Sequence, residues 1–280
     1  MFLLLLKTDL HEGLRSVAPW LAATVVLAMA TGVLFPLVAS AAGLGFDPLE
    51  ATVGDYLAFP FSGLARILWQ PSMTSLKIPA AWLAFCALAL YVPLWYPYRD
   101  LMGFGQKMIV QVGFRYKWWL AKACWTAIVA VLWLVAVMAP LFLCALIGGA
   151  KLSLAVSPHT LAAADVDLSA LVGAPQDATA FFITMAAMFV ALSLLQLTLS
   201  LIVRPIAGFS CSMAILVISL LMMNPYLPGE YLIAARSSIL ATEGFDAQTG
   251  FWLATALAVG SLVAGCVTFR AIDILDKEYS

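Results

Sequence analysis

The chain has 280 residues, of which 64% are apolar and only 10% charged, and its formal net charge is −1. Soluble domains carry about 25% charged residues and about 45–50% apolar ones, so this composition excludes a soluble enzyme, a disordered chain and a protein that binds nucleic acid through a basic surface. A water-soluble fold of this length has too little interior to hide so many apolar side chains. The sequence therefore predicts an integral membrane protein.

Long stretches without Asp, Glu, Lys or Arg predict the membrane-spanning helices, because a hydrocarbon core about 30 Å thick needs roughly 20 apolar residues in a helix. Six stretches of sufficient length occur in the chain. We therefore expect an all-α, polytopic membrane protein with a single transmembrane domain over residues 1–280. The six spans are predicted near 19–42, 78–97, 121–147, 179–203, 205–224 and 249–269.

Residues 1–18 predict an amphipathic helix that lies in the membrane interface ahead of the first span. Pro19 is expected to form the turn between this helix and the span. One alternative is that residues 1–18 are the ragged start of the first span. Another is a cleavable signal peptide, although the apolar stretch exceeds the roughly 7–15 residues usual for one. The leucines that recur at three- or four-residue spacing are Leu3, Leu6, Leu10 and Leu14.

The distribution of Lys and Arg predicts the orientation, because cytoplasmic loops carry an excess of these residues. With the N-terminus in the cytoplasm, the inner segments hold ten Lys and Arg residues and the outer segments hold four. The net charges are then +4 inside and −5 outside. We expect a multi-pass protein of the cell membrane with both termini in the cytoplasm.

The cytoplasmic loop between the second and third spans, residues 99–117, combines apolar, basic and aromatic residues. Its apolar residues fit one side of a short helix, and an apolar surface facing the cytosol usually awaits a partner; they are Leu101, Met102, Met108, Ile109 and Val112. The alternative is that the whole loop only anchors the chain at the membrane surface. Trp lies at the headgroup level and cations meet anionic lipid there, so the predicted anchor residues are Arg115, Lys117, Trp118, Trp119 and Lys122.

The sequence shows no motif for catalysis or for a cofactor. It contains neither the phosphate-binding loop G-x-x-x-x-G-K-[ST] nor the zinc motif H-E-x-x-H. The two histidines, His11 and His159, are predicted on opposite sides of the membrane. Ser210 lies in a Gly-Phe-Ser-Cys sequence, but no span supplies a histidine base for it. We therefore expect no catalytic residue, no metal site and no cofactor bound by this chain.

The interiors of the predicted spans hold no ionisable residue, which argues against an ion-coupled carrier or a proton pump. Gln196, Thr198 and Ser200 of the fourth span are the candidate wall of a translocation path. A hydrogen-bonded contact between helices is an equally good interpretation of Gln196.

Two local sequences, residues 96–106 and residues 114–125, resemble the loop before the third span in permease subunits of type-2 ABC transporters, in particular Gram-positive ones. Many of those permeases read Arg-Trp or Lys-Trp-Trp-Leu-x-Lys near the start of that span. Residues 224–237 and 269–275 are also similar to their counterparts. Six spans with both termini inside match the topology of that family.

The resemblance implies that this chain is the permease of an ATP-driven peptide or drug exporter. A separate ABC ATPase subunit would bind ATP and Mg, and a second permease copy or a homologous permease would complete the transporter in the lipid. The substrate is expected to be hydrophobic or amphipathic, for instance a peptide. The residues that would couple to the ATPase are Arg99, Asp100, Leu101, Met102, Gln106, Lys107, Met108, Ile109 and Gln111.

Two other classes explain part of the pattern. A membrane scaffold or sensor without transport activity has the same spans and the same anchors. A secondary carrier is disfavoured because the spans lack ionisable groups and the sequence has no detectable inverted repeat.

Overall fold

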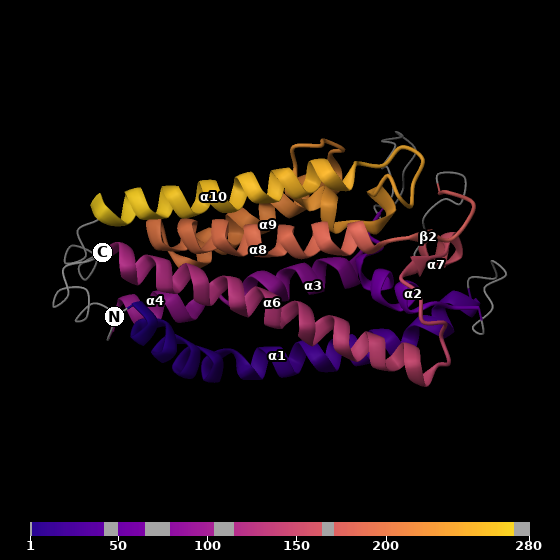
Figure 1. Ribbon diagram of the computed structural model, residues 1–280, viewed down its shortest axis with the longest axis horizontal. Helices are drawn as coiled ribbons and strands as arrows, with labels where there is room; N and C mark the ends of the chain where they lie inside the picture. Colours follow the sequence, from indigo (N-terminus) through magenta and orange to yellow (C-terminus); the bar gives the residue numbers. More distant parts are fainter. Residues whose placement is uncertain (1, 42–49, 65–78, 104–114, 164–170, 272–280) are drawn as a thin grey trace.

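The computed structural model is an elongated bundle of helices (Figure 1). It describes residues 2–41, 50–64, 79–103, 115–163 and 171–271. Helix α1 begins and α10 ends at the same end of the bundle, here called the N-terminal end (Figure 1). The short elements between the long helices gather at the opposite end, here called the loop end.

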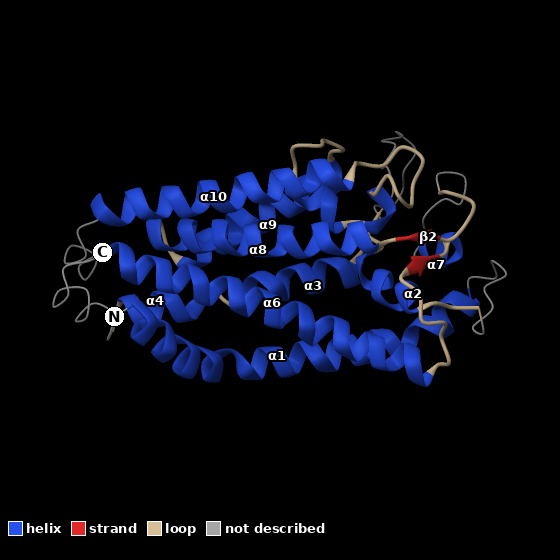
Figure 2. Ribbon diagram, in the orientation of Figure 1, coloured by secondary structure: helices blue, strands red, loops and turns tan. Residues whose placement is uncertain are grey.

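The secondary structure is almost entirely helical, with one two-stranded antiparallel ladder at the loop end (Figure 2). The long helices are α1 (Phe2–Ala41), α3 (Ala80–Tyr91), α4 (Trp95–Leu101), α6 (Arg115–Ile147), α8 (Thr179–Ile202), α9 (Pro205–Leu221) and α10 (Ala247–Ala271). The short elements are α2 (Val53–Ala58), η1 (Phe59–Phe61), β1 (Ala155–Val156), α7 (Pro158–Ala163), β2 (Gln176–Asp177), η3 (Pro228–Leu232) and η4 (Ala234–Arg236).

Among the described residues, five helical segments are long and apolar enough to cross a membrane, which fits an all-α, multi-pass membrane protein. They correspond to the first, second, third, fourth and sixth predicted spans. The fifth predicted span is the 17-residue helix α9, which is about 25 Å long at 1.5 Å per residue. Because α9 is shorter than the usual 20-residue span, the sixth crossing stays a prediction. The five segments are Phe2–Ala41, Ala80–Leu101, Tyr116–Ile147, Thr179–Ile202 and Ala247–Phe269.

Helix α1 shows that the predicted turn at Pro19 is wrong. The helix is continuous over 40 residues, with Pro19 and Pro36 inside it. Proline removes one backbone hydrogen bond and usually kinks or ends a helix, but α1 packs along α6 and stays helical through both sites. Of the four leucines of the predicted amphipathic helix, Leu3 is exposed, whereas Leu6, Leu10 and Leu14 are partly buried against the protein core.

The second predicted span is broken where proline interrupts it. Helix α3 ends at Tyr91 and α4 begins at Trp95, with turn residues that include Pro93 between them. The fourth and fifth predicted spans are separated by Arg204 alone, which predicts a tight hairpin between them, and the structure has this hairpin between α8 and α9. Arg204 is extended, and Pro205 is the first residue of α9, a position where its missing N–H costs nothing.

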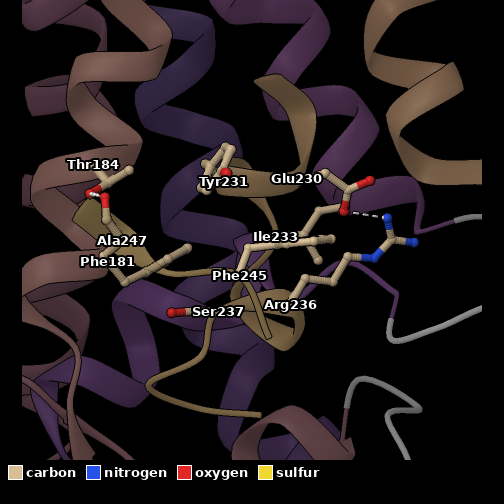
Figure 3. Close-up of a pocket in the computed structure, with 9 residues that line it drawn as sticks. All are labelled: Phe181, Thr184, Glu230, Tyr231, Ile233, Arg236, Ser237, Phe245 and Ala247. Atoms are coloured by element: carbon tan, nitrogen blue, oxygen red, sulfur yellow. Dashed lines mark hydrogen bonds and ion pairs between the residues drawn. The ribbon is translucent and has the colours of Figure 1, made fainter. Parts of the chain in front are cut away.

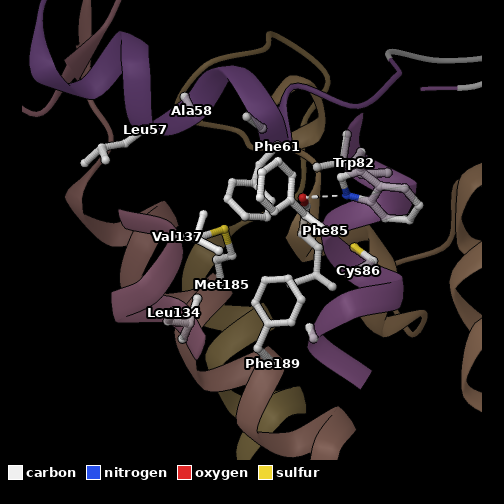
Figure 4. Packing of buried hydrophobic residues seen from close by; sticks show 14 of the residues in the cluster. Leu57, Ala58, Phe61, Trp82, Phe85, Cys86, Leu134, Val137, Met185 and Phe189 are labelled. Atoms are coloured by element: carbon white, nitrogen blue, oxygen red, sulfur yellow. Dashed lines mark hydrogen bonds between the residues drawn. The ribbon is translucent and has the colours of Figure 1, made fainter. Parts of the chain in front are cut away.

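Aromatic side chains fill the core between α3, α6, α8 and the segment η1 (Figure 4). The ring of Phe61 lies 5.8 Å from Phe85 and 5.9 Å from Phe189. Trp82 donates from its indole N–H to the carbonyl of Leu232 at 2.9 Å. This bond ties α3 to the segment η3 and so links the core to the loop end.

A buried carboxylate organises the other part of the loop end. Asp55 in α2 accepts a hydrogen bond from the backbone N–H of Thr52, and its own backbone N–H donates to the Thr52 hydroxyl oxygen; together the two bonds form a capping box for the helix. Its second oxygen accepts from Ser157 N–H at 2.7 Å and from the Thr160 hydroxyl at 2.6 Å. The carboxylate thus accepts from groups on Thr52, Ser157 and Thr160, and the bond from Thr160 joins α2 to α7.

Candidate functional site

The predicted coupling loop is only partly within the described residues. Gln106, Lys107, Met108, Ile109 and Gln111 lie outside them. The remaining members form the last turn of α4 and the residue after it, where the side chains of Arg99 and Met102 are exposed. Leu101 is 2% exposed and packs inside this chain, so its side chain is not available to a partner in this conformation.

A buried charged cluster lies at the N-terminal end of the bundle, immediately beside this loop. The ammonium of Lys122 in α6 forms ion pairs with Asp9 of α1 and, at 2.8 Å, with Asp100 of α4. The hydroxyl of Tyr96 donates to Asp9 at 2.8 Å, and the indole N–H of Trp118 donates to Asp100 at 3.0 Å. We call Asp9, Tyr96, Asp100, Trp118 and Lys122 the charged cluster.

Aromatic faces surround the same ammonium. The Nζ atom of Lys122 lies 4.6 Å from the ring centroid of Tyr96 and 5.3 Å from that of Trp118. Lys122 is 1% exposed, and cation–π contacts are strongest where water is excluded. The cluster thus fastens three helices, α1, α4 and α6, at one point.

The prediction of a headgroup anchor is wrong for Trp118, Trp119 and Lys122, which are all buried by the protein itself. Trp118 stacks on Phe269 of α10 with 5.0 Å between ring centroids. Nearly all sides of α6 are apolar, so its sequence does not reveal which side faces inward. Of the other two predicted anchors, Lys117 is half-buried with Nζ 5.9 Å from the Tyr116 ring, and the side chain of Arg115 lies outside the described residues.

The candidate path residues pack between helices. Gln196 donates to the carbonyl of Leu90 at 2.6 Å, so the helix-contact interpretation of Gln196 is the one the structure supports. Thr198 donates to its own helix and, at 3.1 Å, to the carbonyl of Ser261, which joins α8 to α10. Ser200 is buried against Gly208 in the hairpin. None of these three side chains lines the small pocket found at the loop end.

A second buried ion pair lies at the loop end. The guanidinium of Arg236 meets the carboxylate of Glu230 at 2.7 Å (Figure 3). Arg236 also donates to three backbone carbonyls, those of Leu64, Ser219 and Leu220. Burial raises the pKa of the Glu230 carboxyl, and the charge of Arg236 opposes that shift. This pair closes the last turn of α9 with a side chain from a distant loop.

A small pocket adjoins this second pair, between α8, α10 and the segments η3 and η4 (Figure 3). The volume of the cavity is about 10 Å³, which is room for about one water molecule. The pocket is therefore too small to hold a peptide or a drug-sized molecule. Within the described part of the chain, no group of three or more His, Cys, Asp and Glu side chains gathers to hold a metal.

Sequence reasoning missed Asp9, Tyr96, Glu230 and Arg236. A signal for Asp9 was present, because it is an acid on the same helical face as Leu6 and Gly13, and an acid on an apolar face needs a buried partner. Tyr96, Glu230 and Arg236 gave no such signal, since each lies in or near a loop with no regular periodicity.

Comparison with protein families, with characterised proteins and with solved structures found no match for this chain. The function must therefore be argued from the residues and from their geometry.

Proposed function

We propose that this chain is the membrane-spanning permease subunit of an ATP-driven exporter of the ABC type. It would move a hydrophobic or amphipathic substrate, such as a peptide, by alternating access between the two sides of the cell membrane. A separate ATPase subunit would bind ATP and Mg and supply the energy. A second permease copy or a homologous permease would complete the translocation path.

The observation that carries the proposal is the anchoring of the predicted coupling loop at both ends. Asp100 lies before residues 104–114 in the chain, and Trp118 and Lys122 lie after them. Trp118 donates a hydrogen bond to Asp100, and Lys122 forms an ion pair with it. A force applied to this loop therefore acts directly on α4 and α6. Through Asp9 it acts on α1, and through the Trp118–Phe269 stack on α10. A loop that couples ATP hydrolysis to transport requires direct connections of this kind to the helices on either side of it.

The course of the chain supports six crossings with both termini on one side. The five long apolar segments alone would place the two ends of the chain on opposite sides. Because α1 begins and α10 ends at the same end of the bundle (Figure 1), we propose an even number of passes with α9 as the sixth. A 17-residue helix lies at the short limit of about 17–25 residues for a span.

The test is recovery of the ATPase partner. The full-length chain, carrying an affinity tag, is extracted from its native membrane in a mild detergent, and the proteins that accompany it are identified by mass spectrometry. We expect one ATPase with a phosphate-binding loop at a one-to-one ratio. Met108→Asp should abolish this association, because it places a charge on the apolar side of the predicted coupling helix.

The matched control is Leu152→Asp, which introduces the same charge at an exposed leucine of the loop end. This variant should retain the ATPase. Recovery of the intact chain without any ATPase contradicts the proposal and favours a scaffold or sensor. Equal ATPase recovery with Met108→Asp and with the wild type contradicts the coupling role of the loop.

A further inference from the structure

The charged cluster contains more acid than base. Two carboxylates, Asp9 and Asp100, share the single ammonium of Lys122, so the formal charge of the cluster is −1. Asp9 and Lys122 are both buried by the protein. The two carboxylates compete for one cation, and each would pair more strongly with it in the absence of the other.

Because Lys122 is shared, the Asp9–Lys122 ion pair that attaches α1 costs less to break than a buried pair in which each charge has a single partner. Removing the only partner of a buried charge is strongly unfavourable. When Asp9 leaves, however, Lys122 keeps the carboxylate of Asp100 and the aromatic rings of Trp118 and Tyr96. Arg236 at the loop end differs, because among the described residues Glu230 is the acidic residue that forms an ion pair with it. Lys122 therefore has a second carboxylate to pair with when one leaves, whereas Arg236 is shown with Glu230 alone among the described residues.

A second feature, at the contact between Gly13 of α1 and Trp125 of α6, also favours separation of these two helices. Trp125 of α6 covers Gly13 of α1, where a Cβ atom would lie 2.7 Å from the indole Cε2. The indole N–H of Trp125 is buried and has no hydrogen-bond partner among the described residues. A buried donor without an acceptor is costly, so this α1–α6 contact loses stability that separation of the helices would recover.

A hinge is available immediately beyond this contact. Pro19 lies inside α1 and cannot donate the backbone hydrogen bond that would close the helix there. Helices bend most readily at such positions. Residues 2–18 on its N-terminal side, here called the arm, carry both Asp9 and Gly13.

We propose that the arm is a movable element, which hinges at Pro19 and is held closed on α4 and α6 by the Asp9–Lys122 pair. Release of the arm leaves Lys122 paired with Asp100 and opens the N-terminal end of the bundle, while the loop end stays closed. The proposal concerns this chain alone and does not depend on the proposed export activity.

The test is backbone hydrogen–deuterium exchange of the full-length chain in phosphatidylcholine nanodiscs, read by mass spectrometry on peptides from the arm. Asp9→Asn should speed exchange in the arm by about tenfold or more, because a hydrogen-bonded ion pair is lost. Asp100→Asn should slow exchange in the arm by about threefold, because Lys122 then belongs to Asp9 alone. A purely structural role for the cluster predicts faster exchange in both variants.

Two controls keep the result interpretable. Glu12→Gln removes an exposed carboxylate from the same helix and should leave exchange in the arm unchanged. The peptide that covers Pro228–Arg236 should exchange as in the wild type in every variant, which shows that the fold is intact. Opposite changes for Asp9→Asn and Asp100→Asn support the movable arm, and changes of the same sign, or no change, overturn it. Since no ATPase takes part, failure here is distinct from failure to recover an ATPase partner.

Discussion

The side-chain amide of Gln196 in α8 donates to the backbone carbonyl of Leu90 in α3, with 2.6 Å between Nε2 and O. In an unbroken helix that carbonyl would accept from the N–H of Leu94. Here Leu94 bonds to Tyr91 instead, at 3.1 Å, because Pro93 interrupts the helix. Gln196 thus replaces the hydrogen bond lost at the break between α3 and α4.

Gln196→Leu should destabilise the protein by about 1 kcal/mol, which is the usual size of a side-chain hydrogen bond between membrane helices. The loss stays modest because the substitution also removes the Oε1 atom, which has no partner among the described residues. Thermal unfolding in one detergent measures the effect. Ser193→Ala, which loses only a bond within its own helix, should change the midpoint less. A midpoint equal to that of the wild type for Gln196→Leu would contradict this role.

Two glycines of α10 form a matched pair for testing how α10 packs. A Cβ atom at Gly265 would lie 2.6 Å from Cη2 of Trp119, whereas a Cβ atom at Gly260 would meet nothing within 4 Å. We expect Gly265→Ala to cost about 1–3 kcal/mol through overpacking. Gly260→Ala should be neutral or stabilise by up to about 1 kcal/mol, because alanine favours helix. The midpoints of thermal unfolding of the two variants measure this difference, and equal shifts would contradict the prediction.

Arg236→Met should lower the free energy of unfolding by about 3–5 kcal/mol, because it leaves the carboxylate of Glu230 buried and unpaired. It also removes the donors to the carbonyls of Ser219 and Leu220 in the last turn of α9. Unfolding by denaturant in detergent micelles is the measurement. Lys151→Met, which removes an exposed cation at the same end of the bundle, should change stability by less than about 0.5 kcal/mol. A similar effect of both substitutions would argue against the buried pair.

The raised pKa of Glu230 predicts how stability depends on pH. Its folded-state pKa lies above the ordinary value of 4.5, so above pH 4.5 the folded protein retains a proton that the unfolded chain has released. The contribution of this group is fully present below pH 4.5 and is lost as the pH rises through the folded-state pKa. Glu230→Gln should remove this part of the pH dependence.

Thermal midpoints between about pH 4 and about pH 8 measure that slope. The comparison concerns the slope and not the level, because Glu230→Gln also removes the anion that pairs with Arg236. An unchanged slope in Glu230→Gln would show that this carboxyl titrates alike in the folded and unfolded states.

The sequence by itself determined the class of the protein, the long helices and the hairpin at Pro205. These features depend on local composition, since a charge-free apolar stretch of roughly 20 residues matches the thickness of the hydrocarbon core of a membrane. The sequence also singled out the loop around Asp100, which it predicts to be cytoplasmic, as its most distinctive segment. It misjudged Pro19, because packing of α1 on α6 keeps the chain helical where a proline alone would favour a turn.

Only the tertiary structure decided which way each side chain faces. A helix that is apolar on nearly every side does not reveal its inward face, so Trp118, Trp119 and Lys122 suited a lipid anchor as well as a buried cluster. The partners of Lys122 are Asp9 and Asp100, from helices distant in the chain. Because the burial and pairing of a charge depend on residues brought together by folding, no local pattern in the sequence predicted this contact.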